Sequence, residues 1–292
     1  MVETHTFRPL RLHHMDPGTL YVVATPLGNL GDLSTRAAEV LRTVPVVAAE
    51  DTRRTRGLLT HLGASPTLLS FHAHSNDHRQ NALVDILLSG RNIALVSDAG
   101  TPTISDPGAE LITVARAAGI PVVPIPGATA VAAALSASGL AGDRYLFLGF
   151  IPRKGRERTR LLTRAANEEW SVVLYEAPVR LVALLEDLIP LAGADRRAVV
   201  ARELTKLHEE IRGGTLGELA DHYANLAPRG EITVVLQGTG TPPAEPDRTG
   251  DALEQATSLL AEGLTRREVV RRLTESLGLP RNEAYRLVME LP

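Results

Sequence analysis

Short apolar runs alternate with amphipathic stretches along the first half of the chain. The apolar runs predict strands at residues 19–25, 45–50, 67–72, 92–97 and 121–126. The stretches between them predict helices at residues 34–44, 51–62, 77–89, 107–119 and 127–139. Because these strands show no polar alternation and each is followed by a helix, we expect a mostly parallel sheet covered on both faces.

A second α/β block follows residues 144–158, which interrupt this rhythm. Its pattern predicts strands at residues 171–176, 198–204, 209–214 and 231–237, and helices at residues 157–167, 179–191 and 216–224. The strands at 209–214 and 231–237, with a helix between them, indicate a mixed sheet. The predicted fold class is therefore α/β, with two α/β domains and a small C-terminal helical module.

The same pattern predicts the domain organisation. Residues 1–17 form a flexible tail, 18–140 the first α/β domain, 141–238 the second, and 239–250 a Pro/Gly-rich linker. Residues 251–292 carry three helical patterns typical of a helix-turn-helix module. In the second of them, Thr265 and Glu268 have the spacing of a capping box, and Gly278 and Pro280 are expected to end it and to start the third.

Composition excludes several classes of protein. The 292 residues are 44% hydrophobic, carry a formal net charge of −3 and include no cysteine, so disulfides and thiolate chemistry are absent. No apolar run approaches the length of a membrane span, and the first 17 residues do not resemble a secretory signal. We expect a cytoplasmic enzyme.

Three predicted strand-to-helix loops could hold a ligand, because ligands of parallel sheets bind beyond the carboxyl ends of strands. The loop TPLGNLGDLS has neither the dinucleotide fingerprint nor a Walker loop. In SDAGTPTISDPG, Asp106 before Pro107 reads as a helix N-cap, whereas Asp98 directly follows the strand and has no helix to cap. Two explanations for an acid at position 98 stay open: contact with a ligand, or a role in the turn alone. In PIPGATAVAAAL, Thr129 opens a helix of small residues suited to close packing.

Several of these segments carry a family resemblance. The stretches GTLYVVATPLGNLGDLSTRA, AAEDTRRTRGLL, IALVSDAGTPTISDPG, VVPIPGATAVAAALSASGL, LGFIPRKGRER, LYEAPVRL and ARELTKLHEE occur in this order. Together they resemble the ribosomal RNA small-subunit methyltransferase I family, within the tetrapyrrole methylase superfamily, over residues 18–238. The SDAGTP loop follows the RNA-methylating branch, because corrinoid-methylating members have GDP there.

The resemblance implies a cofactor and a set of residues that bind it. The cofactor is S-adenosyl-L-methionine, bound in a cleft between two α/β domains. The positions that match the family's cofactor contacts are Pro26, Leu27, Ser97, Asp98, Thr101, Pro102, Ala128, Thr129, Tyr175 and Glu176.

The resemblance also implies a substrate and partners. The acceptor is the 2′-hydroxyl of a cytidine ribose in the decoding region of 16S ribosomal RNA, either naked or in the assembled 30S subunit. A homodimer is implied as well. Two alternatives stay open, namely methylation of a corrinoid or another small molecule, and a non-catalytic RNA-binding protein that kept the fold.

Methyl transfer to a hydroxyl needs no metal, but a base or a cation should assist ionisation of the hydroxyl. The candidate catalytic residues are Glu50, Asp51, Glu203 and Lys206. Asp51 could instead simply cap a helix. Glu203 and Lys206, three residues apart, would share one face of a helical turn with Arg202 beside them, and an exposed ion pair is the alternative.

Two sets of residues suggest contacts with RNA. PRKGRERTR places five positive side chains in nine residues, several of them before or at a helix start, where the helix dipole disfavours cations. We expect Arg153, Lys154 and Arg156, together with Arg53 and Arg54 of AEDTRR, to contact phosphates. His72 and His74, with His78 nearby, could suggest a metal, but no further ligand pattern supports one, so no metal site is predicted.

Overall fold

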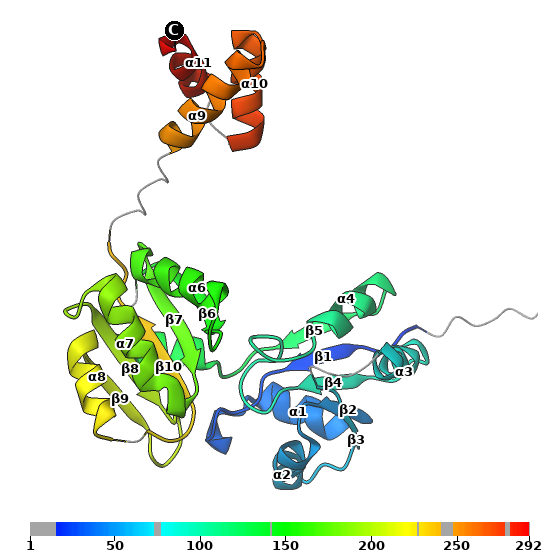
Figure 1. Ribbon diagram of the computed structural model, residues 1–292. Coiled ribbons are helices and arrows are strands. Elements are labelled where there is room, and N and C mark those ends of the chain that lie inside the picture. Colours follow the sequence, from blue (N-terminus) through cyan, green and yellow to red (C-terminus); the bar gives the residue numbers. More distant parts are fainter. Residues whose placement is uncertain are drawn as a thin grey trace, which may run out of the picture. The chain divides into compact units, whose positions relative to one another are not determined.

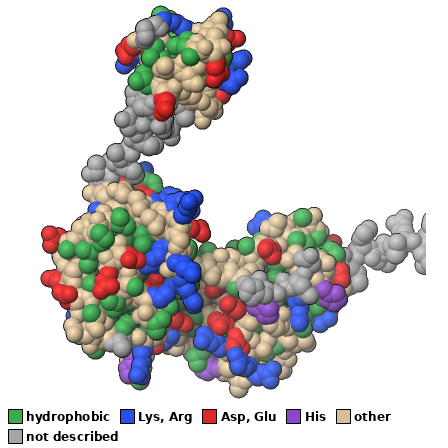
Figure 2. All heavy atoms as spheres, viewed as in Figure 1, with side chains coloured by type: hydrophobic (Ala, Val, Ile, Leu, Met, Phe, Trp, Pro, Cys, Tyr) green, Lys and Arg blue, Asp and Glu red, His purple; other side chains and the backbone are tan. Residues whose placement is uncertain are grey.

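The computed structural model describes residues 16–72, 77–140, 142–226, 228–240, 248–277 and 281–291. The chain forms two compact units, Met1–Gly240 and Thr241–Pro292 (Figure 1). Charged side chains are spread over the surface of each (Figure 2). Most of the predicted N-terminal tail and residues 241–247 of the predicted linker lie outside the described residues.

Five parallel strands form the first sheet, in the order β3-β2-β4-β1-β5. These strands are β1 (Leu20–Val23), β2 (Val46–Ala49), β3 (Thr67–Ser70), β4 (Ile93–Val96) and β5 (Val122–Ile125). Helices α1 (Thr35–Thr43) and α2 (Thr52–Leu62) cover one face of this sheet. Helices α3 (Asp77–Leu88) and α4 (Ala109–Ala117) cover the other face. Alternate residues of β2 enter the two cores, which explains why the strand is apolar throughout.

The second sheet is mixed, as predicted, with the order β6-β7-β10-β8-β9. Its strands are β6 (Tyr145–Phe150), β7 (Ser171–Glu176), β8 (Arg197–Arg202), β9 (Glu210–Thr215) and β10 (Ile232–Leu236). Only β6 and β7 run parallel; the other neighbours are antiparallel. The sequence pattern did not predict β6, because a glycine and a bulge break its apolar run.

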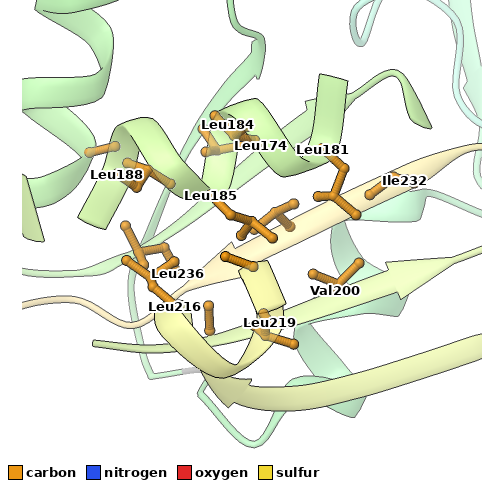
Figure 3. Packing of buried hydrophobic residues seen from close by; sticks show 14 of the residues in the cluster. Leu174, Leu181, Leu184, Leu185, Leu188, Val200, Leu216, Leu219, Ile232 and Leu236 are labelled. Atoms are coloured by element: carbon orange, nitrogen blue, oxygen red, sulfur yellow. The ribbon is translucent and has the colours of Figure 1, made fainter. Parts of the chain in front are cut away.

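Helices α6 (Arg156–Asn167), α7 (Leu181–Ala192) and α8 (Leu216–Ala224) cover one face of the second sheet. Figure 3 shows leucines of α7, among them Leu184 and Leu188, packed over the strands together with Leu216 and Leu219 of α8. These side chains are almost completely buried and form the largest apolar core of the unit.

Helix α5 (Ala130–Ser138) covers the opposite face of the second sheet, although it follows the last strand of the first. Its Val131, Ala134 and Leu135 pack against Val173 of β7 and Val235 of β10. The small residues predicted to allow close packing therefore do so, but against the second sheet. This packing joins the two sheets of the unit into one body.

Short 3₁₀ helices follow two of the strands. The helix η1 (Leu30–Asp32) follows β1, and η2 (Pro178–Arg180) follows β7. Ser34 is the N-cap of α1, because its hydroxyl accepts a hydrogen bond from the Ala37 N–H at 3.2 Å.

The C-terminal unit consists of α9 (Arg248–Ala261), α10 (Arg266–Leu277) and α11 (Arg281–Glu290), packed around Ala252, Val269 and Leu273. The predicted capping box is only half formed. Glu268 accepts a hydrogen bond from the Thr265 N–H at 2.9 Å, but the threonine hydroxyl also donates to Glu268 instead of accepting. Gly278 and Pro280 lie outside the described residues. No helix in the described ranges is long and apolar enough to cross a membrane.

Candidate active site

A cleft of about 380 Å³ lies where the loops at the carboxyl ends of the first sheet face the strand ends of the second. Its volume falls in the range of small-molecule sites, about 300–1,000 Å³. Four loops of the first sheet contribute to the lining. The loop after β1 contributes Leu27, the loop after β2 Glu50, the loop after β4 Asp98 and the loop after β5 Thr129. The complete lining is Leu27, Glu50, Arg54, Asp98, Ala99, Gly100, Thr101, Ile104, Ser105, Asp106, Thr129, Ala130, Phe150, Tyr175, Glu176, Ala177, Pro178, Gly230, Glu231, Ile232 and Thr233.

The position of the cleft follows from the topology of the first sheet. Strands β1 and β4 are neighbours, but the connection after β1 leads to one side of the sheet and that after β4 to the other. Such a switch point opens a crevice between the two loops. Here the loops are tied together: Thr25 and Gly100 exchange two backbone hydrogen bonds of 2.8 and 3.0 Å.

A second link connects the loops after β4 and β5. The hydroxyl of Thr101 donates to the Ala128 carbonyl at 3.2 Å. Gly100 has a φ of +82°, and a Cβ there would lie 3.3 Å from the Leu27 side chain, so a larger residue would be strained and crowded. The three loops that the sequence pattern singled out thus form one connected surface.

Carboxylates dominate the polar lining of the cleft. The lining includes five acidic residues and one basic residue, Arg54. The acidic residues are Glu50, Asp98, Asp106, Glu176 and Glu231. Asp98 accepts a hydrogen bond from the Asp51 N–H at 3.0 Å, and the Asp98 N–H donates to Glu50 at 3.3 Å. Arg54 lies 3.6 Å from Asp98. Asp98 therefore holds the loop after β2 against the loop after β4.

The pKa values reflect this crowding of negative charge. Burial, with smaller contributions from the charges of Asp98 and Asp51, raises the pKa of Glu50. Burial also raises the pKa of Asp106 to about 6, reinforced by the charge of Glu50. Negative charges held at this density in a partly desolvated cleft favour a ligand with positive charge.

The predicted N-cap role of Asp106 is wrong. Helix α4 begins only at Ala109, and its N-cap is Gly108, which has a φ of +127° and forms no side-chain cap. Thr103 and Ser105 also have positive φ values, so the chain makes an irregular loop before the helix. Asp106 lines the cleft, as Asp98 does.

The end of β7 contributes an aromatic ring and a buried acid. Tyr175 contacts the rings of Phe147 and Phe150 edge-on, with centroids 4.9 and 5.5 Å away. The Glu176 side chain is completely buried, pairs with Arg180 of η2, and accepts the Ala177 N–H at 2.7 Å. Its Oε2 atom has no hydrogen-bond partner among the described residues. The two residues predicted to face the cofactor are therefore both in the cleft.

Of the four further residues predicted to contact the cofactor, three line hollows that adjoin the cleft. Pro26 and Ser97 line an adjoining hollow of about 280 Å³, which shares Leu27, Arg54 and Asp98 with the cleft. Ala128 lines a shallow surface next to Thr129. Pro102 is buried and lines none of these hollows.

The predicted helical turn of Arg202, Glu203 and Lys206 does not form, but Glu203 and Lys206 pair as in the ion-pair alternative. These residues lie at the end of β8 and in the turn after it, where Glu203 and Thr205 have φ values of +52° and +67° instead of a helical conformation. Lys206 Nζ lies 2.8 Å from Glu203 and 3.1 Å from Glu231, whereas Arg202 pairs with Glu210 at 3.0 Å. Only Glu231 of this network lines the cleft.

The environment of Lys206 opposes a role as a base. Partial burial acts to lower its pKa, but the hydrogen bonds and charges of Glu203 and Glu231 outweigh burial, and the pKa is raised. Lys206 is thus held as an ammonium ion at neutral pH. Its stem packs on the loop after β1, because a Cβ at Gly28 would lie only 2.2 Å from Lys206 Cγ. An electrostatic role for Lys206 stays a prediction.

The helix-capping interpretation of Asp51 is confirmed. Its carboxylate accepts the Arg53 N–H at 2.8 Å at the start of α2 and pairs with the Arg53 guanidinium, also at 2.8 Å. The hydrogen bonds from Arg53 lower the pKa of Asp51 to about 2. Asp51 does not line the cleft, so it is poorly placed to accept a proton from a bound substrate.

The basic stretch divides into two sets of side chains. Arg158 is structural, because it pairs with Asp187 at 2.6 Å and donates to the Pro152 carbonyl. Arg153, Lys154 and Arg156 are exposed and form no ion pair with any described residue. Figure 2 shows blue side chains gathered over α6, which begins in this stretch. Unpaired cations at a helix start are available to bind anions.

The histidines do not provide a metal site among the described residues. No group of three or more His, Asp or Glu side chains close enough to hold a metal ion occurs there. His74, one of the two residues that raised the question, lies outside the described residues.

Comparison with known proteins identifies the family. A model of the tetrapyrrole (corrin/porphyrin) methylases matches residues 19–220. The chain is 49% identical over 275 residues to a Synechocystis protein named ribosomal RNA small subunit methyltransferase I, covering 94% of this chain and 98% of that one. A Xylella fastidiosa protein of the same name is 46% identical over 271 residues, covering 92% and 98%. The chain belongs to the tetrapyrrole methylase family.

A solved methylase supports the fold. The uroporphyrin-III C-methyl transferase from Thermus thermophilus, complexed with S-adenyl homocysteine, matches with a TM-score of 0.56 and 19% identity. The match covers 75% of this chain and 97% of that one. At this identity the likeness confirms the predicted α/β fold and nothing finer.

The lining residues of the cleft that sequence reasoning missed include Asp106, Phe150, Glu231 and Thr233. The signal for Asp106 was available, because a second acid in the same long loop as Asp98 is unusual for a simple connection. Thr233 could have been found by period-2 counting, since it alternates with the buried core residues Ile232 and Val234.

The raised pKa of Asp106 predicts a pH dependence of stability. Because its pKa in the folded chain, about 6, exceeds the ordinary 3.8, the folded chain binds this proton more tightly than the unfolded one. The resulting stabilisation is complete below about pH 4 and is lost as the pH rises to about 6. Asp106→Asn removes this pH-dependent contribution. Relative to wild type, the variant should therefore gain about 1 kcal/mol of unfolding free energy between pH 4 and 7, a value reduced for partial exposure.

Urea unfolding of the wild type and Asp106→Asn at pH 4, 5, 6 and 7 measures this difference. Asp85→Asn, an exposed acid on α3, serves as the control and should show no such trend. A constant difference between Asp106→Asn and wild type across this range would contradict the raised pKa.

Proposed function

We propose that this chain transfers a methyl group from S-adenosyl-L-methionine to the 2′-hydroxyl of a cytidine ribose in the decoding region of 16S ribosomal RNA. Relatives that share 46–49% of their residues with nearly the whole chain are named for ribosomal RNA of the small subunit. The observation that carries the proposal is a carboxylate-lined cleft in the same unit as three exposed cations, Arg153, Lys154 and Arg156, which pair with no described acid.

The cleft fits the methyl donor in both size and charge. S-adenosylmethionine carries positive charge on its sulfonium and amino groups, which suits the carboxylates of Asp98, Asp106 and Glu231. Thr101 and Thr129 place polar groups in the same wall, and Leu27 provides an apolar one. When bound, the donor supplies an electrophilic methyl group, and the transfer requires no metal.

The residues of the chain then have to position the acceptor and take up its proton. A 2′-hydroxyl is weakly acidic, so a carboxylate that is ionised yet basic assists it best. Asp106, with a pKa of about 6, meets both conditions, and Glu50 is the second candidate, because burial raises its pKa as well and both residues line the cleft. Lys206 and Glu203, which pair with each other, are suited to hold Glu231 in place instead.

The RNA is expected to approach from the side of the basic stretch. Arg153, Lys154 and Arg156 are free to contact phosphates, and Arg54 reaches the cleft itself. Arg53 is exposed, although Asp51 neutralises part of its charge. The proposal covers both naked RNA and the assembled 30S subunit as the substrate. It also includes that the chain acts as a homodimer in the cytoplasm.

Mapping of methylation tests the activity. Small subunits from cells that lack this protein should acquire one 2′-O-methylcytidine in the decoding region when incubated with the chain and S-adenosylmethionine, as detected by mass spectrometry of RNA fragments. No metal needs to be added. If the RNA stays unmodified while a corrinoid or porphyrin is methylated, the proposal is wrong and the chain is a small-molecule methylase.

The salt dependence of RNA binding tests the basic stretch. Replacing Arg153, Lys154 and Arg156 by alanine removes up to three phosphate contacts, each contributing roughly 0.7–0.9 to the slope of log K against log salt. The slope should become shallower by about 2, while affinity for S-adenosylmethionine is unchanged. A matched variant, with the exposed Arg36, Arg91 and Arg116 replaced by alanine, has the same change in charge and should keep the wild-type slope. Equal slopes for the two variants would assign the stretch to the solvated surface.

A further inference from the structure

Phe150 is an aromatic side chain at the end of β6 that lies in the cleft without being buried. It lines the cleft, yet 56% of the residue is exposed. Aromatic side chains are usually more buried, because their large apolar surface stabilises a protein most when removed from water. An exposed ring in the wall of a ligand cleft is therefore available for contact with a ligand.

A β-bulge in β6 places this ring on the cleft side. Phe147 pairs with Val173 of β7, and Phe150 pairs with Tyr175, so three residues of β6 span two of β7. In a regular strand, residues 147 and 150 would point to opposite faces. The extra residue brings both rings to the face of Tyr175, and bulges often re-aim side chains beside functional sites in this way.

Gly149 makes the bulge feasible. It has a φ of +64°, which other residues adopt only with strain, and a Cβ there would approach the Ser105 hydroxyl to 3.0 Å. The loop that carries Ser105 and Asp106 is thereby brought next to the bulge. The local backbone of β6 is thus specialised in a way that turns Phe150 into the cleft.

The surroundings of Phe150 suit a nucleotide. Tyr175 supports the ring through an edge contact with centroids 5.5 Å apart, so the two rings are not stacked on each other. Arg153 and Lys154 follow within four residues and have no acidic partner among the described residues. An exposed ring followed in the chain by exposed cations suits an unpaired nucleotide, because proteins bind such nucleotides by stacking the base and neutralising the phosphate.

We propose that Phe150 forms a base-stacking subsite, which holds the nucleobase of the nucleotide whose ribose is methylated. The inference rests on the proposed function and adds how the acceptor is held. Stacking fixes the base beside the cleft, so that the attached ribose hydroxyl reaches the carboxylate-lined interior. The adenine of the methyl donor is the competing occupant, and affinity for the donor distinguishes the two.

Three variants test the subsite: Phe150→Ala, Phe150→Trp and Tyr145→Ala. Tyr145 lies at the other end of β6, is 50% exposed and does not line the cleft, so it controls for loss of an exposed aromatic side chain. The measurements are single-turnover methylation of unmethylated small subunits as a function of their concentration, and calorimetric titration with S-adenosylmethionine. Circular dichroism checks that each variant is folded.

We expect Phe150→Ala to raise the half-saturating concentration of small subunits roughly 5- to 150-fold, the equivalent of about 1–3 kcal/mol per stacked base. Phe150→Trp should restore it to within a few fold, Tyr145→Ala should match wild type, and affinity for S-adenosylmethionine should stay constant in all three. Loss of donor affinity in Phe150→Ala would assign the ring to the adenine, and unchanged methylation would remove it from recognition. Either result overturns the subsite while leaving the proposed function intact; a wild-type chain without activity on small subunits removes both.

Discussion

The packing of α5 against the second sheet is the contact on which the site depends. Ala134 and Val131 pack against Val173 and Val235, although α5 belongs in sequence to the first sheet. Without this contact, the loops of the first sheet would have no opposing wall. With it, Asp98 and Thr129 face Tyr175 and Thr233 across one cleft. The alanine-rich composition of α5 is explained by this contact, because small side chains let a helix lie close to a sheet.

Charge is divided between the cleft and its surroundings. The chain is nearly neutral overall, but carboxylates line the cleft, while Arg153, Lys154 and Arg156 lie on the surface without an ion pair to any residue that the structure describes. A cationic methyl donor and a polyanionic acceptor require opposite fields, and a single uniformly charged surface would repel one of them. Arg54 is the exception, since it lies inside the cleft next to Asp98.

Much of this arrangement could be predicted from the sequence, and the failures have physical causes. Apolar periodicity identified all strands except β6, where Gly149 and the bulge break the pattern. Motif order identified the family and the loops. Local rules failed for Asp106 and Lys206, because both lie in segments with positive φ values, where capping and helical spacing do not apply. Glu231 could not be found by motif, since its role depends on a register between distant strands.

The central claim is that the carboxylates of the cleft bind a positively charged methyl donor. Calorimetric titration with S-adenosylmethionine of the wild type, Asp98→Asn and Asp51→Asn tests it most directly. Both substitutions remove one negative charge and keep the shape of the side chain, but only Asp98 lines the cleft. The account predicts at least a tenfold loss of affinity in Asp98→Asn, equivalent to about 1.4 kcal/mol, and wild-type affinity in Asp51→Asn. Equal affinities in all three proteins would contradict it.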